Sequence, residues 1–214
     1  MPALTGPLFS LTARKSLRKT LTYSSWRGIQ YVRSHVIPAN PNSTAQQEQR
    51  QNFRNVNLLW DYSGTRFREP WTARATGQPF TDRNLLLKQN IQAIYGETDM
   101  QSMVFSPGAG GAPPPTISSI TPGSGQLTVN IAAPTAPTGW TIVEAVAAAV
   151  VDFDPQSPQS AVVIKEGFDA TSTYAVVLTG LPASLCVVGA WLKWMKPDGE
   201  FAYSTADVDT ATPS

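Results

Sequence analysis

The feature that most constrains this 214-residue chain is the series of short apolar runs that fills its second half. About seven runs with strand-like composition, among them QLTVNIAA, AVVIKE and SLCVVGAWLKWM, alternate there with turn signals such as PGSG, PQSPQS and KPDG. Short strands at this regular spacing are typical of a two-sheet sandwich, because each strand must bury one face against a second sheet. We therefore predict an all-β sandwich over residues 117–214.

A glycine- and proline-rich segment, SPGAGGAPPPT at residues 106–116, precedes this series. Its glycines give conformational freedom and its proline triplet favours an extended chain, which is the usual composition of a linker between domains. We therefore expect one domain over residues 1–105, a linker over residues 106–116 and the sandwich after it. The segments PPTISSITPGSGQLTVN and LTGLP resemble immunoglobulin-like and fibronectin type III domains, so an immunoglobulin-like sandwich is expected.

The first 36 residues show the alternation of apolar and polar side chains that predicts strands. Three strands are expected, over Leu8–Ala13, Thr20–Trp26 and residues 28–36, with a basic turn, RKSLRK, between the first two. Three such consecutive strands are expected to form a short β-meander.

Two helices are predicted after these strands. Pro38 and Pro41 end the third strand, because proline lacks an amide hydrogen. A helix is expected from about Ser43 to Asp61, capped by the side chain of Ser43 or Thr44, because apolar residues recur at helical spacing on one face: Phe53, Val56 and Trp60. A second helix is expected over Asp82–Tyr95, and residues 63–79 between the two read as a linker. The meander and these two helices make residues 1–105 a small α+β domain.

The net charge of +1 conceals an uneven distribution. Residues 1–112 hold ten Arg and three Lys against six acidic residues, whereas residues 113–214 hold three Lys, no Arg and nine acidic residues. Two halves of opposite charge are most simply interpreted as two domains with different neighbours.

Basic side chains of the first half are the candidate contacts to an anionic partner. Four surround the predicted turn between the first two strands: Arg14, Lys15, Arg18 and Lys19. Four more are expected to join them in docking: Arg27, Arg33, Arg50 and Arg54. Nucleic acid and an acidic patch on a neighbouring protein both fit this cluster, and a solvated turn explains the first four equally well. Because no platform of stacking aromatics and no nucleic-acid-binding motif accompanies them, we do not expect nucleic acid.

The chain offers little for catalysis or metal binding. Its single histidine, His35, stands at a strand end, where a hydrogen-bonded structural role is expected, and its single cysteine, Cys186, fits a small core residue. Asp152 and Asp154 are the best candidates for calcium, but the loop after them adds few of the oxygen ligands that calcium requires. We therefore expect no enzymatic activity, no cofactor and no metal site.

The order of YVR, VIPANPNSTAQQEQR, a helix and TGQPFTDRNLLLKQN, over about residues 7–95, resembles a group of small proteins encoded among the virion genes of tailed bacteriophages. Members of that group often carry an appended immunoglobulin-like domain. The resemblance implies a structural protein of the virion, made in the host cytoplasm. We expect a capsid decoration (cement) protein that docks through its N-terminal domain onto the major capsid protein or other virion proteins, as a homo-oligomer within the particle.

Three alternatives stay open. Within the virion, the chain fits a neck, tail or baseplate protein as well. From another class, a free adhesion or carbohydrate-binding module would hold a host-surface glycan on exposed aromatics: Trp191 or Trp194, and Tyr203. Because neighbours along a strand point to opposite faces, at most part of the set of Trp140, Trp191 and Trp194 is expected to be buried. A DNA-packaging accessory is the third alternative, and no membrane association is expected, because the chain has no run of eighteen apolar residues.

Overall fold

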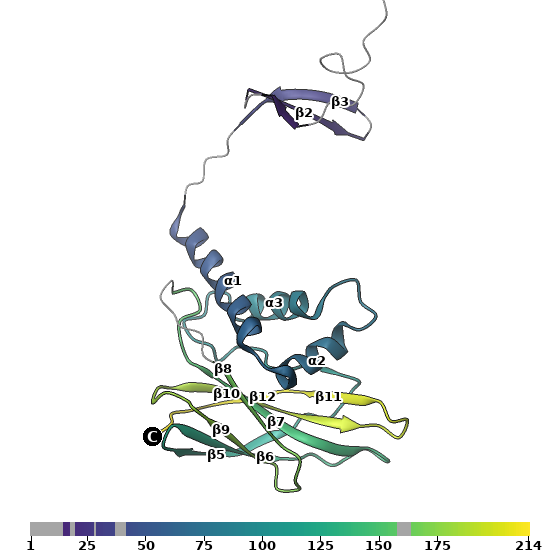
Figure 1. Cartoon of the computed structure of the whole chain (residues 1–214), viewed down its shortest axis with the longest axis vertical. Helices are drawn as coiled ribbons and strands as arrows, with labels where there is room; N and C mark the ends of the chain where they lie inside the picture. The colour runs from purple at the N-terminus through teal and green to yellow at the C-terminus, as the bar shows by residue number, and fades with distance from the viewer. Residues whose placement is uncertain (1–14, 18–19, 28, 37–41, 158–163) are drawn as a thin grey trace, which may run out of the picture. The chain divides into compact units, whose positions relative to one another are not determined.

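A computed structural model of the chain describes residues 15–17, 20–27, 29–36, 42–157 and 164–214. Its residues form two compact units, Met1–Asn42 and Ser43–Ser214, each described here by itself (Figure 1). The division therefore falls after Asn42, whereas the composition led us to expect it at residues 106–116. That segment is held in place, because Pro107–Ala109 form strand β4, which pairs with strand β11, and Ser106 Oγ donates a 2.6 Å hydrogen bond to the Ser204 carbonyl.

The first unit contains an antiparallel meander in the order β1-β2-β3. Its strands are β1 (Lys15–Leu17), β2 (Leu21–Trp26) and β3 (Ile29–Ser34). Trp26 lies opposite Ile29 across a two-residue turn, and Arg27 in that turn has a φ of 49°, which matches the twist of tight hairpins. The second and third predicted strands are confirmed, and the one predicted over Leu8–Ala13 lies outside the described residues. The turn predicted at RKSLRK is wrong, because Lys15–Leu17 of that segment form β1 and pair with β2.

Three helices open the second unit: α1 (Thr44–Tyr62), α2 (Thr65–Ala75) and α3 (Asp82–Ala93). The helices predicted from Ser43 and from Asp82 are confirmed to within two residues at each end. The predicted side-chain cap of α1 is wrong, because only the Ser43 carbonyl accepts amide hydrogen bonds there, from Gln46 and Gln47 at 3.0 Å each. Phe53 was predicted on the buried face but is 52% exposed. Leu59 instead joins Val56 and Trp60 in the core.

Helix α2 contradicts the linker expected over residues 63–79. Pro70 lies inside this helix, where it removes one backbone hydrogen bond. Two contacts with the rest of the unit compensate. Glu166 Oε2 accepts a 2.9 Å hydrogen bond from the Phe67 amide, which has no partner within the first helical turn, and the side chains of Phe67 and Trp71 are fully buried. Tertiary packing therefore overrides the local helix-breaking signal.

Two antiparallel sheets follow. Their strands are β5 (Thr116–Gly123), β6 (Gln126–Ala132), β7 (Thr141–Val151), β8 (Ile164–Asp169), β9 (Ala175–Thr179), β10 (Cys186–Met195), β11 (Phe201–Thr205) and β12 (Asp207–Ala211). One sheet has the order β5-β6-β9, and the other has the order β4-β11-β10-β7-β8, with β12 also paired to β10. The chain is thus a mixed α and β protein whose second half fits the predicted sandwich.

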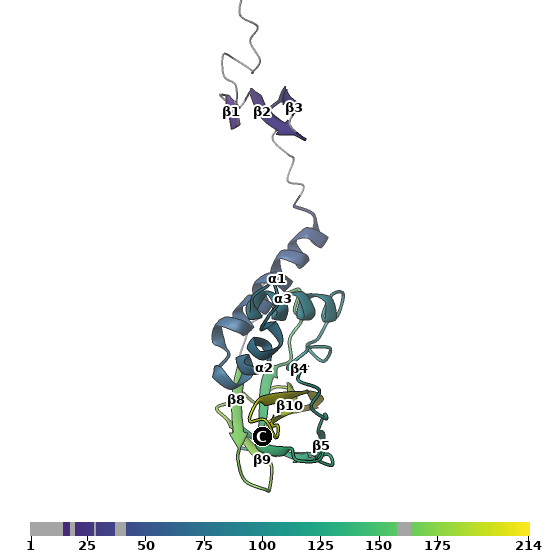
Figure 2. The same ribbon diagram turned by 90° about the vertical axis from the view of Figure 1, so that its right-hand side faces the viewer.

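Strands β7 and β10 form a central layer with both faces covered. Alternate residues of β7 belong to two different cores. One set packs against the helices: Val146, Ala148 and Val150. The other set packs against β6 and β9: Ala145, Ala147 and Ala149. Figures 1 and 2 show the three helices together on one side of the sandwich. This arrangement explains the continuous apolar run TIVEAVAAAVV, which is typical of a strand that is buried on both faces.

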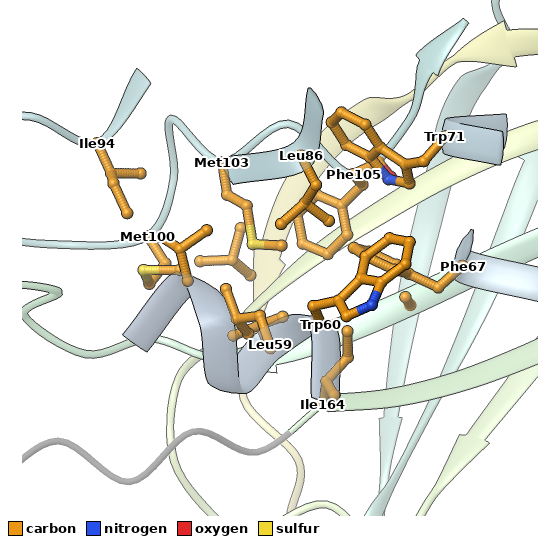
Figure 3. Packing of buried hydrophobic residues seen from close by; sticks show 14 of the residues in the cluster. Leu59, Trp60, Phe67, Trp71, Leu86, Ile94, Met100, Met103, Phe105 and Ile164 are labelled. Carbon is orange, nitrogen blue, oxygen red and sulfur yellow. The ribbon is translucent and has the colours of Figure 1, made fainter. Parts of the chain in front are cut away.

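Aromatic side chains fill the space between the helices and β10 (Figure 3). The Phe67 ring meets the rings of Phe105 and Trp191 edge to face, with centroids 6.4 and 6.1 Å apart. Trp71 Nε1 donates a 3.1 Å hydrogen bond to the Phe105 carbonyl. Gly189 of β10 lies against the Phe105 ring, where the Cβ of any other residue would collide with it. The helices and the sandwich therefore share one core.

Candidate assembly surface

Charge divides at the boundary between the two compact units. Residues 1–42 contain six basic and no acidic residues, whereas residues 43–214 contain ten basic and fifteen acidic residues. The formal charges are thus +6 and −5, with no acidic residue on the basic side. The first unit is the part of the chain that is suited to an anionic neighbour.

One face of the meander is apolar and basic. Side chains alternate along a strand, so Ile29, Tyr31 and Arg33 of β3 share a face, and the register places Trp26 of β2 on the same face, opposite Ile29. Trp26 is 68% exposed, Ile29 70% and Tyr31 39%. The Arg27 guanidinium lies 5.7 Å from the Trp26 ring centroid. We call these five residues the meander face.

The opposite side of the meander is only partly covered. Tyr23, at 7% exposure, is the one large apolar side chain buried among the described residues of this unit, while Leu21 and Val32 are 37% and 46% exposed. A small sheet needs a packed hydrophobic face to be stable by itself. Exposed apolar surface of this kind is typical of interaction sites, so the described part of the first unit offers a candidate surface for binding.

The eight basic residues predicted to dock are separated by the fold. Three lie outside the described residues: Arg14, Arg18 and Lys19. Of Lys15, in β1, only the backbone is described. Two belong to the meander face, Arg27 and Arg33. The last two, Arg50 and Arg54, are exposed on α1 in the other unit. Among the side chains that the structure describes, Arg27 and Arg33 thus share the meander face, and Arg50 and Arg54 lie one helical turn apart on α1.

Part of the charge asymmetry is balanced inside the second unit. Arg66 Nε of α2 lies 3.2 Å from Glu144 Oε2 of β7, and Lys193 Nζ of β10 lies 2.7 Å from Glu69 Oε2 of α2. Tyr203 Oη donates a 3.2 Å hydrogen bond to the same Glu69 oxygen, and burial, together with the Glu69 charge, raises the pKa of Tyr203. These basic and acidic side chains, expected to face different neighbours, instead join helix α2 to the sheet.

The residues considered for chemistry have structural roles. Thr22 Oγ1 lies 3.2 Å from His35 Nδ1, so the predicted hydrogen-bonded role of His35 is confirmed. Cys186 is fully buried, as predicted, and burial together with the Asp152 charge raises the pKa of its thiol. Asp152 Oδ1 accepts a 2.9 Å hydrogen bond from the Met100 amide. In the described ranges, no group of three or more His, Cys, Asp or Glu side chains is arranged to hold a metal ion.

The glycan platform predicted from exposed aromatics is wrong. Trp191 and Trp194 are fully buried and Tyr203 is only 7% exposed. Trp191 packs with the helices and Trp194 packs inside the sandwich, so both faces of β10 are covered. The expectation that at most part of the set of Trp140, Trp191 and Trp194 is buried holds, but its reasoning does not, because it assumed that one face of β10 meets solvent. Trp140 is half-buried, with its ring centroid 6.3 Å from that of Trp194.

Two open grooves lie beside the helices. The first, of about 500 Å³, lies between α2 and β11, and its lining includes Arg68, Glu69, Phe201 and Tyr203. The second, of about 440 Å³, lies between the start of α1 and residues 154–157 and is lined mainly by polar, uncharged side chains. Neither lining contains a histidine or a cysteine.

A scan against protein-family models and a search of curated proteins gave no match. Among the helices that the structure describes, none is long and apolar enough to cross a membrane. The candidate site that the geometry offers is the meander face.

Proposed function

We propose that the chain is a non-enzymatic structural component of a tailed-phage virion, and specifically a capsid decoration (cement) protein. Residues 1–42 dock to the particle and residues 43–214 project from it. The observation that carries this proposal is the contrast between a basic unit with exposed apolar side chains and a unit with two closed cores. The resemblance of residues 7–95 to virion proteins supports the choice of particle.

Docking combines hydrophobic burial with charge. Trp26 and Ile29, each about two-thirds exposed, supply apolar area to be buried against a subunit of the shell. Arg27 and Arg33 face acidic groups of that subunit, which increases the rate of association and fixes the orientation of the bound chain. Symmetry repeats the contact at equivalent positions on the particle, and if linked copies bind together, modest individual affinities suffice for a stable coat.

We infer that the sandwich of the projecting unit is immunoglobulin-like. Counting from β5, the first, second and fifth strands (β5, β6, β9) form one sheet, and the third, sixth and seventh (β7, β10, β11) belong to the other. Immunoglobulin-like domains divide their A, B and E strands from their C, F and G strands in the same way. Here β8, the fourth strand, joins the second sheet, whose outer face is covered by the helices.

Charge reversal in pairs tests the docking assignment. We expect Arg27→Glu with Arg33→Glu to abolish incorporation into particles, because acidic side chains on the meander face would repel an acidic subunit surface. The pair Arg50→Glu with Arg54→Glu, on the exposed side of α1, tests whether that helix also docks, as the charge distribution of the sequence predicts. The matched control is Arg74→Glu with Lys88→Glu, two exposed positions on α2 and α3, which should leave incorporation unchanged.

Three results would lead to different conclusions. Loss of incorporation in the first pair alone would limit docking to residues 1–42. Normal incorporation of both test pairs would exclude the docking assignment but leave a virion role intact. Absence of the unmodified chain from purified particles would exclude the virion role itself.

One observation favours a second candidate, a DNA-packaging accessory. The first unit has no acidic residue, and its exposed Trp26 lies beside Arg27, a pairing suited to phosphates and bases. Such binding would weaken steeply with salt, since counterions are released when basic side chains neutralise phosphates. Titration of the full chain with duplex and single-stranded DNA at low and high salt tests this candidate, and no binding at low salt would exclude it.

A further inference from the structure

The third strand of the meander has an open edge. His35 N donates a 2.7 Å hydrogen bond to the Thr20 carbonyl, so this residue is hydrogen-bonded to the β2 side. In an antiparallel pair, hydrogen-bonded and non-hydrogen-bonded positions alternate, so Arg33 also directs its backbone groups toward β2. Val32 and Ser34 therefore direct their amides and carbonyls away from β2. In the described part of this unit, no strand pairs with that edge.

This edge has little of the protection that soluble proteins usually give to edge strands. β3 has the sequence IQYVRS, six residues without proline or glycine, and Arg33 is its only charged residue. The edges of the second unit differ. β4 is three residues long and begins at Pro107. β9 is also an edge strand, but β8 of the other sheet lies close beside it. A Cβ added to Gly167 of β8 would come within 2.8 Å of the Val177 carbonyl oxygen of β9. A poorly protected edge on the unit with exposed apolar side chains indicates that β3 is paired in the functional assembly.

We propose that β3 pairs antiparallel with β3 of a second copy of this chain, about a two-fold axis that passes through Val32. The two three-stranded meanders then become one continuous sheet. In this register Tyr31 lies opposite Arg33 of the second copy, and Gln30 lies opposite Ser34. The outward backbone groups of Val32 meet those of Val32 in the second copy, and the outward backbone groups of Ser34 meet those of Gln30.

The sequence of β3 is self-complementary in this register. Its single charged residue, Arg33, meets an aromatic ring and not a second arginine, so like charges are not opposed and the guanidinium can stack on Tyr31. Val32, which is 46% exposed in one copy, gains an apolar partner at the axis. Because the two-fold axis is perpendicular to the sheet, the meander faces of both copies lie side by side on the same side of that sheet. The apolar and basic surface that is available for docking is thereby doubled.

Two valine substitutions at matched positions test the pairing. Val32 and Val177 both lie on strands and are 46% and 49% exposed. We expect the unmodified full chain to sediment as a dimer at micromolar concentration, Val32→Lys to sediment as a monomer and Val177→Lys to remain a dimer. Val32→Lys should prevent dimerisation, because the positively charged ammonium groups of the two copies would repel each other at the axis. Far-ultraviolet circular dichroism reports whether each variant retains its fold.

Covalent trapping gives a second result that does not depend on the stability of a lysine variant. Val32→Cys should form an intermolecular disulfide under mild oxidation, since the two side chains face each other at the axis, while Val177→Cys and the buried native Cys186 should not. A monomeric unmodified chain, equal association of both lysine variants, or equal cross-linking of both cysteine variants would each overturn the proposal. The test uses the free chain, so its outcome is separate from that of particle incorporation.

Discussion

The two compact units of this chain differ in how deeply their tryptophan side chains are buried. In residues 43–214, Trp71, Trp191 and Trp194 are fully buried between layers of the same unit. In the meander, Trp26 and Ile29 are 68% and 70% exposed. The difference shows that a tryptophan in the sequence does not by itself indicate a core, because these three are packed inside one unit and Trp26 is left exposed in the other.

The comparison is tested most strongly by removing one tryptophan from each unit. Trp191→Ala should lower the free energy of unfolding by about 3–5 kcal/mol, because it leaves a cavity between the helices and β10. Trp26→Ala should change it by less than about 0.5 kcal/mol, as expected for an exposed side chain, but should weaken assembly. Urea denaturation followed by circular dichroism measures both. Equal losses in the two variants would show that the meander has a stable core of its own.

The close contact of β10 with the helices can be tested next. Gly189→Ala should destabilise the larger unit by about 1–3 kcal/mol, since its Cβ would collide with the Phe105 ring. Phe105→Ala removes that obstacle at the cost of a cavity. The double variant should therefore be more stable than the sum of the two single losses predicts, because the residues are in contact. Strict additivity in denaturant titrations would show that the ring does not press on this strand.

A smaller effect is expected where α2 is joined to the sheet by charge. Glu69→Gln should cost about 1–2 kcal/mol, because Glu69 accepts from both Lys193 and Tyr203 in a partly buried site. Glu200→Gln is the matched control. Its carboxylate lies 3.8 Å from Lys196 and is 73% exposed, so its loss should cost less than about 0.5 kcal/mol. If the two variants are equally stable in thermal melts, the charged contact does not hold α2 in place.

The smallest effect concerns the turn between β8 and β9. Burial alone would raise the pKa of Asp169, but hydrogen bonds from Thr171, Thr173 and the Ala175 amide outweigh it and lower that pKa below its usual value. A lowered folded-state pKa contributes stability that is present above about pH 4 and is lost as the pH falls through the folded-state value. Carboxyl titration by nuclear magnetic resonance should show the lowered pKa, and Thr171→Val should move it upward. An unchanged value in that variant would contradict the assigned cause.

Sequence patterns predicted the elements of the fold better than their packing. Alternation and turn residues identified seven of the eight strands from Thr116 onward, and helical spacing identified α1 and α3, because these signals are local. Strand β12 was not predicted. Helix α2 escaped prediction because the hydrogen bond from Phe67 to Glu166 and the burial of Trp71 come from distant parts of the chain. The linker at 106–116 was expected from composition, but composition does not reveal that Pro107–Ala109 pair with β11.

The candidate site was predicted in part. Basic residues of the first half were identified from charge alone, yet charge does not distinguish Arg33, on the meander face, from Arg66, which pairs with Glu144 inside the second unit. The apolar members Trp26 and Ile29 were not among the predicted contacts. A strand pattern indicates that side chains alternate between the two faces, but it does not indicate which face is left uncovered. The signal that was available is the absence of acidic residues from 1–42.

The most direct test of the central claim is cryo-electron microscopy of purified phage particles that contain this chain, with the chain traced in the density. The account predicts residues 1–42 in contact with shell subunits at many symmetry-related positions, with Trp26 buried and residues 43–214 projecting outward. Density on the tail axis alone would move the chain to the neck, tail or baseplate. Contact made through residues 43–214, with the meander face exposed, would contradict the account.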